Sequence, residues 1–419
     1  MRTSAFTQSL RLLRTRRFGT FWFASLLSNI GTWAQQVAQP WLLLSLGASP
    51  FLLGLDSFAL SAPVFLMTLV GGALADSTDR RRTIVSFQSA QMMCPILIVV
   101  LLLFGAVQPW MVILLSLVVG FTDGLSMPSF QSIVPSIVEK EQIPTGIALN
   151  STQFNLSRIA GPAIAGILMA SSGAVGAFAV SAASYLPFIL VVLWILPRTP
   201  LRSEQSEGFD LHRLRANVRT VLSQPLLRGA LATVFVTSVL CAPVVVFCPL
   251  LVKEAFHGDV SHFSLAVGAF GVGGLLGALG LLSATALRDL RPLSSGFAVV
   301  YGVVVMAAGW SGNPWALSLL FVLAGISMTV SNTSANVVLQ SSADNSIRGQ
   351  TVSLYMLAMR GGIALGSLIT GLSVGVVGVR DALAINGALA VLLHLVVARL
   401  WLRTPLPPAS SEVGTDHSG

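Results

Sequence analysis

Two charged residues, Asp123 and Arg158, stand within stretches of sequence that are otherwise apolar. A charge at the centre of a lipid bilayer costs at least about 3 kcal/mol, so we expect both side chains to face protein or water. A carboxyl group that moves between dry and wet surroundings, or toward and away from an arginine, can take up and release a proton. Asp123 and Arg158 are therefore our proton-coupling candidates. On neighbouring antiparallel helices they could pair, and a purely structural ion pair is the alternative.

Two further charges, Arg360 and Asp56, also fall in apolar stretches. Arg360 could attract an anionic substrate, support a gate, or only extend its charge to the headgroups. Asp56 stands nearer the end of its stretch, and we expect it to be exposed to the lipid headgroups.

Amides and indole rings crowd two other apolar stretches, around residues 33–41 and 332–336. Such side chains bind an amphiphilic organic molecule through stacking and a few hydrogen bonds. Polar contacts between packed helices are the alternative. The substrate-cavity candidates are Trp33, Gln36, Gln39, Asn332, Asn336 and Arg360.

The sequence contains no arrangement of residues typical of an enzyme. Its three cysteines and five histidines are scattered without metal-ligand spacing, and it has no phosphate-binding loop. We therefore expect no catalytic residues, no metal and no cofactor, and we expect a transmembrane proton gradient to be the energy source.

The composition explains how these residues must be positioned. Of the 419 residues, 54% are hydrophobic and only 10% are charged, and the mean hydropathy is +0.81. A soluble globule of this size cannot hide so much apolar surface, so the composition excludes a soluble enzyme, a disordered chain and a secreted disulfide scaffold. It predicts an all-α polytopic membrane protein with twelve spans of about 20 residues or more. The expected spans are 19–46, 51–75, 83–106, 109–134, 143–170, 174–196, 226–252, 262–287, 293–311, 315–339, 350–377 and 381–403.

The positive charges divide unevenly between the two ends of these spans. With the N-terminus in the cytoplasm, twenty of the 24 lysine and arginine residues fall on the cytoplasmic side, and only Lys253 and Arg380 fall outside. This bias predicts a multi-pass protein of the plasma (inner) membrane with both termini in the cytoplasm. The net charge of +8 then reports orientation, and we expect the bilayer, not nucleic acid, as the partner.

The spans fall into two groups of six. We expect an N-terminal six-helix bundle at 1–196, a cytoplasmic linker with an amphipathic helix at 197–225, a C-terminal bundle at 226–403 and a disordered tail at 404–419. The triplet Gly72-Ala-Leu74 recurs as Gly277-Ala-Leu279, which favours duplication of a six-helix unit. Parallel halves of this kind are one of the transporter architectures.

The stretch after the second span carries a motif at residues 71–82. It resembles the signature between helices two and three of the major facilitator superfamily, although Ser77 and Asp79 depart from its pattern. The resemblance implies a gate at which a glycine lets two helices approach and an aspartate caps the N-terminus of the eleventh helix. An anchor for the positive-inside orientation is the alternative. The gate candidates are Gly72, Asp76, Asp79, Arg80, Arg81 and Arg82.

Residues 127–166 resemble the exporter branch of this superfamily, which includes enterobactin and macrolide efflux proteins. Within them Gly161, Pro162 and Gly166 resemble part of the fifth-helix packing signature associated with antiporters. The resemblance implies a monomeric secondary transporter that exports a small amphiphilic molecule, such as a drug, a macrolide or a siderophore, in exchange for protons. The alternatives are an importer or uniporter of the same fold and a non-pumping channel or sensor.

Overall fold

The computed structural model describes residues 5–196, 218–283, 289–343 and 348–405, and its elements in these ranges are all helices. The side chains of residues 72–77 lie outside the described part. So do most of the predicted linker and nearly all of the predicted tail. Of the expected amphipathic helix only residues 218–223 are described, and they are helical, with Val221 buried and Leu222 exposed.

The first half of the chain forms six long helical segments. The 53-residue helix α7 contains two of them, because Gly173 takes the left-handed backbone φ of 64° and turns the chain back. The elements are α1 (Ala5–Leu13), α2 (Arg16–Ser45), α3 (Pro50–Ser77), α4 (Arg80–Leu103), α5 (Pro109–Gln131), α6 (Ile133–Ile137), the short helix Lys140–Gln142 and α7 (Ile143–Ile195).

The second half repeats this number of segments with more interruptions. Prolines 243 and 249 and two π-helical turns divide the seventh segment, and a third π-turn interrupts the eleventh. The elements are α9 (Pro225–Val236), a π-turn (Thr237–Cys241), α10 (Pro243–Val246), α11 (Cys248–Leu250), a π-turn (Leu251–Ala255), α12 (Val260–Ser283), α13 (Arg291–Trp310), α14 (Pro314–Ser342), α15 (Arg348–Met356), a π-turn (Leu357–Gly361), α16 (Gly362–Val377) and α17 (Val379–Leu402).

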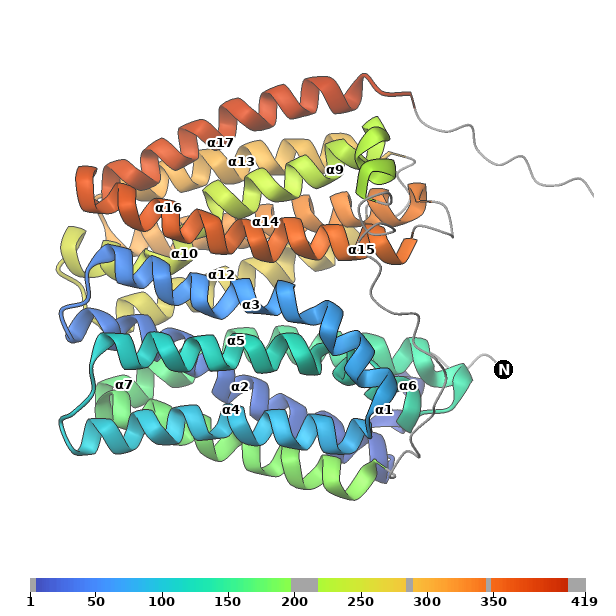
Figure 1. The fold of residues 1–419 in the computed structure, drawn as a ribbon. Helices are drawn as coiled ribbons and strands as arrows, with labels where there is room; N and C mark the ends of the chain where they lie inside the picture. Colours follow the sequence, from blue (N-terminus) through green and yellow to red (C-terminus); the bar gives the residue numbers. More distant parts are fainter. Residues whose placement is uncertain (1–4, 197–217, 284–288, 344–347, 406–419) are drawn as a thin grey trace, which may run out of the picture.

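Twelve of these segments correspond to the expected spans. In the described residues nine helices are long and apolar enough to cross a membrane, and one of them is α7, which counts twice. Helix α2 and helix α3, whose apolar part is Pro50–Val64, complete the set. The predicted fold of twelve helices in two bundles is therefore confirmed, and Figure 1 shows the two bundles one above the other.

The halves meet along two helix pairs. Helix α3 packs against α16, and α7 packs against α12. Within the halves the pairing is similar: α3 packs on α5 in the first, and α12 packs on α14 in the second. Figure 1 shows α3 and α16 running side by side along the boundary between the bundles.

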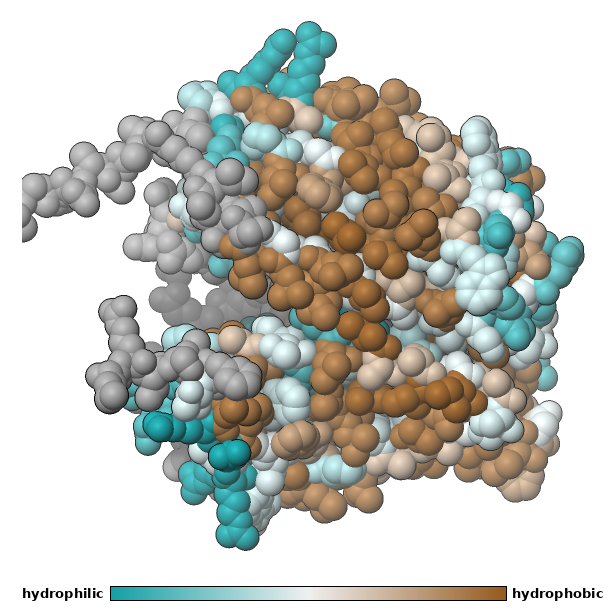
Figure 2. Space-filling model, turned by 180° about the vertical axis from the view of Figure 1, so that it is seen from behind, coloured by the Kyte–Doolittle hydropathy of each residue, from teal (hydrophilic) through white to brown (hydrophobic). Residues whose placement is uncertain are grey.

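The two ends of the molecule differ in charge. We call one the basic end, because it carries the starts of α2, α4 and α13 and the end of α17, with arginines at each. We call the other the far end, where the chain turns between α2 and α3, between α4 and α5, and at Gly173 and Gly378. In Figure 1 the basic end lies at the right, beside α1 and α15. Figure 2 shows apolar residues over the middle of one face and hydrophilic ones toward the ends, as a membrane-spanning bundle requires.

The hydrophobic core is shared at the far end and divided at the basic end. One cluster joins residues of both halves, including Leu43 of α2, Phe178 of α7 and Phe263 of α12. A second cluster consists of first-half residues around Phe18 and Ile195, and a third consists of second-half residues around Leu227 and Trp401. The halves thus hold together at the far end, whereas at the basic end each half has a core of its own.

Candidate substrate and proton sites

Asp123 lies on α5 in a cluster of amides and hydroxyls. The Gln91 side-chain amide of α4 donates to Asp123 Oδ1 at 2.7 Å and to Thr122 Oγ1 at 3.2 Å. Gln88 in turn donates to Gln91 Oε1 at 2.9 Å. These bonds orient the carboxylate within the membrane-spanning part of the first half.

The positive charge that acts on Asp123 comes from the second half. It belongs to Arg360, on the π-turn between α15 and α16. The Arg360 Nε is buried and donates no hydrogen bond to any group in the structure, whereas a buried N–H normally has a partner. The electrostatic interaction between Asp123 and Arg360 therefore crosses the boundary between the halves.

Arg158 has surroundings of a different kind. Its guanidinium carbon lies 5.7 Å from the ring centre of Trp33, on α2, and 4.9 Å from that of Phe270, on α12. Its charge also interacts with Tyr301 of α13. Two aromatic rings, one from each half, thus hold the cation.

The pairing of Asp123 with Arg158 that the adjacent spans suggested is wrong. Each of these two side chains has the partners given above, and the arginine that acts on Asp123 is Arg360. Adjacency of two helices in sequence does not fix how each is rotated about its axis, and this rotation decides which side chains meet.

Asp56 also departs from expectation, because it is buried and not at the headgroups. Only 7% of it is exposed. Ser116 Oγ of α5 donates to Asp56 Oδ1 at 2.6 Å, and the Gln39 amide of α2 lies 2.9 Å from both carboxylate oxygens. Gln39, expected in the substrate cavity, is thereby part of a buried cluster that joins α2, α3 and α5 toward the far end.

The other cavity candidates occupy several environments. Trp33 is half-buried between Arg158 and Phe154. Gln36 is exposed, and Asn336 accepts a hydrogen bond from Gln340 at 3.0 Å. Asn332 has a buried side-chain oxygen that accepts no hydrogen bond in the structure. Of this set, Asn332 has a buried acceptor without a hydrogen bond, and Trp33 lies beside Arg158.

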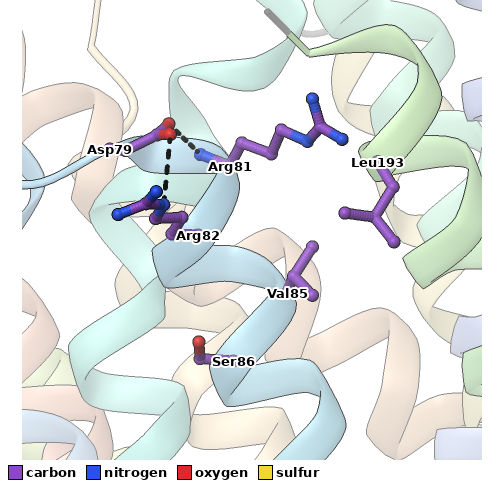
Figure 3. Close-up of a pocket in the computed structure, with 6 residues that line it drawn as sticks. All are labelled: Asp79, Arg81, Arg82, Val85, Ser86 and Leu193. Atoms are coloured by element: carbon purple, nitrogen blue, oxygen red, sulfur yellow. Dashed lines mark hydrogen bonds and ion pairs between the residues drawn. The ribbon is translucent and has the colours of Figure 1, made fainter. Parts of the chain in front are cut away.

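The gate motif is only partly described. Gly72 and Asp76 lie in the last turns of α3, and the surroundings of their side chains fall outside the described residues. Asp79 is the N-cap of α4: its Oδ1 accepts from the Arg81 backbone N–H at 3.1 Å, and Arg82 Nε is 4.0 Å from its Oδ2. Figure 3 shows Arg81 extending toward Leu193 across a groove of about 260 Å³ at the basic end. Arg80, at the first position of α4, is half-buried.

The glycines of the fifth-helix motif lie where helices approach closely. A Cβ on Gly161 would collide with Trp33 Cβ of α2 and reach Ile30 O at 3.0 Å. A Cβ on Gly166 would reach Ser264 Cβ of α12 at 2.9 Å. Pro162 is buried beside them. These positions hold α7 against its own half on one side and against the second half on the other.

The sequence pattern alone did not mark Ser116 and Gln91, the partners of the two buried carboxylates. Both are polar residues within predicted spans, and this is the signal that could have marked them. Which carboxylate each contacts depends on helix rotation, which the spacing of apolar residues in a membrane does not define.

Comparison with known proteins assigns the family. The pattern of the family described as "Transmembrane secretion effector" matches residues 7–417. The chain is 24% identical to a staphyloferrin A transporter of Staphylococcus aureus, covering 90% of this chain and 94% of that protein. It is 26% identical to the enterobactin exporter EntS of Salmonella choleraesuis, covering 98% and 99%. It is 26% identical to the multidrug efflux pump Tap of Mycolicibacterium fortuitum, covering 79% and 82%.

Solved structures agree on the fold. A bacterial homologue of the human lysosomal transporter Spinster superposes with a TM-score of 0.72 at 15% identity, covering 95% of this chain and 99% of that one. The nucleoside transporter NupG superposes with a TM-score of 0.69 at 14% identity, covering 92% and 99%. The chain therefore belongs to the transmembrane secretion effector family of the major facilitator superfamily, as a multi-pass membrane transporter and not an enzyme.

Proposed function

We propose that the chain exports a small amphiphilic organic molecule in exchange for protons, by alternating access. The names of its relatives support export, since they include an enterobactin exporter and a multidrug efflux pump. The coupling is supported by the position of Asp123, which Gln91 orients in the first half, and by the charge of Arg360 in the second half, whose buried Nε donates no hydrogen bond. Protonation of Asp123 cancels its attraction to Arg360 and so changes the free energy of one arrangement of the halves relative to the other.

The proposal assigns the basic end to the cytoplasm. The positive-inside rule supports this, because arginines such as Arg81, Arg82 and Arg403 gather there. With this orientation each half has a core of its own on the cytoplasmic side, and the two halves share one core on the outer side. Substrate then enters from the cytoplasm between the halves, and a proton enters from outside after the halves have reoriented.

We further propose that 1–196 and 226–403 move as two rigid bundles linked by 197–225, with 404–419 as a tail. The separate cores at the basic end support this, because each half packs its own side chains there without help from the other. We also propose that the protein works as a monomer, with a cavity between the halves near Trp33 and Asn332. The motif with Asp76, Asp79 and Arg80 would stabilise the state that is closed at the basic end.

The coupling is tested by transport into proteoliposomes under an imposed pH gradient, with the intact chain. We expect the gradient to drive accumulation and Asp123→Asn to abolish this dependence, while exchange of labelled for unlabelled substrate continues. Asp381→Asn, which removes an exposed carboxyl at the start of α17, is the matched control and should behave as the wild type. Gradient-independent transport, or an Asp123→Asn variant that still responds to the gradient, contradicts the coupling.

The direction is tested in everted membrane vesicles. Export predicts that the energised vesicles accumulate substrate. Accumulation in right-side-out vesicles alone would make the protein an importer, and equilibration without accumulation would make it a uniporter. Single-channel conductance in a planar bilayer would contradict a pump of any kind.

A further inference from the structure

Arg158 is a cation at membrane depth on which no carboxylate acts in the described part of the chain. The group that interacts electrostatically with it is Tyr301, and its guanidinium stacks on Trp33 and Phe270. Each cation–π contact contributes roughly 0.5–2 kcal/mol, which offsets part of the cost of placing the charge there but supplies no countercharge.

The other buried charges of the spans are already accounted for. Asp123 interacts with Arg360, and Asp56 is bound by Gln39 and Ser116. Arg158 thus has no negatively charged partner among the described residues at the boundary between the halves.

The hydroxyl group that interacts electrostatically with Arg158 has no hydrogen-bond partner either. Tyr301 is fully buried, and its OH neither donates nor accepts a hydrogen bond in the structure. A buried hydroxyl left unpaired costs about 1–3 kcal/mol. An anion that accepts from both Tyr301 and Arg158 would give the hydroxyl an acceptor and the guanidinium a countercharge.

Arg158 is itself half-buried: α12 packs closely against it on one side, and an exposed residue lies next to it toward the basic end. On α12, Gly274 faces Arg158: a Cβ there would lie 3.2 Å from Arg158 Nη1 and 3.3 Å from Thr329 Oγ1. One turn nearer the basic end on α7, Phe154 is 46% exposed while its ring packs edge-on against Trp33. The rings of Phe154, Trp33 and Phe270 offer an apolar, aromatic surface next to the charge.

We propose that Arg158 and Tyr301 bind the carboxylate of the transported molecule, and that this molecule is an organic anion with an aromatic or apolar body. The anion site itself does not depend on the proposed function; only the identification of the bound anion as the transported substrate does. Because the two rings around Arg158 come from different halves, an anion bound there contacts both halves and changes the balance between their arrangements.

The test uses three probes that share one body and differ in charge: 2-naphthoate, 2-naphthamide and protonated 2-naphthylmethylamine. Binding to the full chain in nanodiscs is measured by tryptophan fluorescence, with Trp33 beside the site, and by thermal shift. We expect 2-naphthoate to bind at least about tenfold more tightly than either other probe. Equal affinities for the three, or binding of none of them at millimolar concentration, overturns the proposal.

Variants locate the site. Arg158→Gln should weaken 2-naphthoate binding about tenfold or more, and Arg158→Lys, which keeps the charge, should weaken it less. Tyr301→Phe, which removes only the hydroxyl, should weaken it about threefold to tenfold and keep the fold intact. Arg219→Gln, at an exposed position of the segment 218–223, is the control. Unchanged binding in both Arg158→Gln and Tyr301→Phe contradicts the site, which then serves only to pack the halves.

The two proposals fail in different ways. If the wild type shows no gradient-driven export but binds 2-naphthoate through Arg158, the proposed function fails and the anion site stands. If gradient-driven export is observed and binding does not discriminate charge, the anion site fails and the proposed function stands.

Discussion

The far end and the basic end of this molecule are packed in opposite ways. At the far end one core spans both halves, where Trp41 of α2 stacks on Phe263 of α12 with ring centres 6.0 Å apart and planes at 15°. At the basic end each half has a separate core. A tryptophan side chain in each of these cores donates a hydrogen bond to a backbone carbonyl of the same half. Trp22 Nε1 donates to Leu149 O at 2.8 Å in the first half, and Trp401 Nε1 donates to Leu226 O at 2.9 Å in the second.

This difference shows which end can separate at little cost. Parting the halves at the basic end leaves both local cores intact, whereas parting them at the far end exposes apolar side chains that now cover one another. The far-end contacts therefore set the stability of the observed arrangement. In an alternating-access transporter the far-end contacts are lost when the far end opens. The contacts that form when the basic end closes must then be stable enough to offset this loss.

Small residues allow the halves to come together at the far end. A Cβ on Gly54 of α3 would collide with the backbone carbonyl of Ser367 on α16, and a Cβ on Gly371 would lie 2.8 Å from Pro50 O. Backbone cannot move aside as a side-chain tip can, so these glycines permit an approach that any larger residue prevents.

The largest expected effect comes from Gly54→Ala, which prevents α3 from packing as closely on α16. Overpacking typically costs about 1–3 kcal/mol, so we expect the far-end-closed state to lose population about tenfold or more and transport to slow accordingly. The initial transport rate in proteoliposomes checks this. Gly375→Ala on α16, where the added Cβ meets nothing within 4 Å, is the matched control. Wild-type transport by Gly54→Ala would show that the far end does not close as described.

The buried cluster around Asp56 should matter next, through stability. Asp56→Leu removes the carboxylate that accepts from both the Gln39 amide and the Ser116 hydroxyl, and leaves them only Ser116 Oγ and Val112 O as acceptors. This loss should lower the free energy of unfolding by about 2 kcal/mol. Asp56→Asn keeps an acceptor oxygen and should lose less. Thermal unfolding in detergent compares the two variants. The account of this cluster fails if Asp56→Leu unfolds at the wild-type temperature.

A smaller effect is expected from a hydrogen bond that joins the halves at the α3–α16 boundary. Ser57 Oγ donates to Ser367 Oγ at 3.0 Å, and a bond of this kind contributes about 1 kcal/mol. Ser57→Ala and Ser367→Ala should each lower the population of the far-end-closed state about fivefold relative to the state with the far end open. The double variant should lower it hardly more than either single variant does. Ser171→Ala, whose hydroxyl bonds within its own helix, is the control. Additive effects of the two substitutions would contradict a shared bond.

The smallest effect should come from the basic end, at the ion pair of Asp289 and Arg291. Partial burial raises the pKa of Asp289, but hydrogen bonds and charge from Arg291 outweigh it and hold the pKa below its ordinary 3.8. Arg291 also donates to Trp401 O at 3.1 Å and Thr404 O at 2.7 Å, which ties α13 to the end of α17.

A carboxylate with a lowered pKa stabilises the fold above its ordinary pKa and ceases to do so as the pH falls through the lowered value. Asp289→Asn should therefore cost about 1 kcal/mol or less at neutral pH, and nothing once the pH is below both pKa values. Thermal unfolding of variant and wild type against pH measures this difference. A difference that is constant with pH, or that grows in acid, would contradict the ion-pair account.

The sequence predicts the helices of this protein better than their contacts. Long apolar runs, proline and glycine breaks and the arginines of the basic end were enough for twelve spans in two groups. The predictions of an exposed Asp56 and of Arg158 as the partner of Asp123 were wrong for one reason, and for the same reason the contacts of Gln39 were not predicted. In a membrane the outer face of a helix is as apolar as its packed face, so the spacing of apolar residues does not reveal how the helix is rotated.

The most direct test of alternating access is to measure distances at both ends of the same protein. Spin labels at Gln108→Cys and Gly375→Cys report the far end, and labels at Glu139→Cys and Ser341→Cys report the basic end. All four positions are exposed, whereas the three native cysteines are buried. We predict that without substrate the far-end distance is short and the basic-end distance long, and that under transport conditions a second population appears with both reversed. Distances that stay fixed while transport proceeds, or that lengthen together at both ends, would contradict the account.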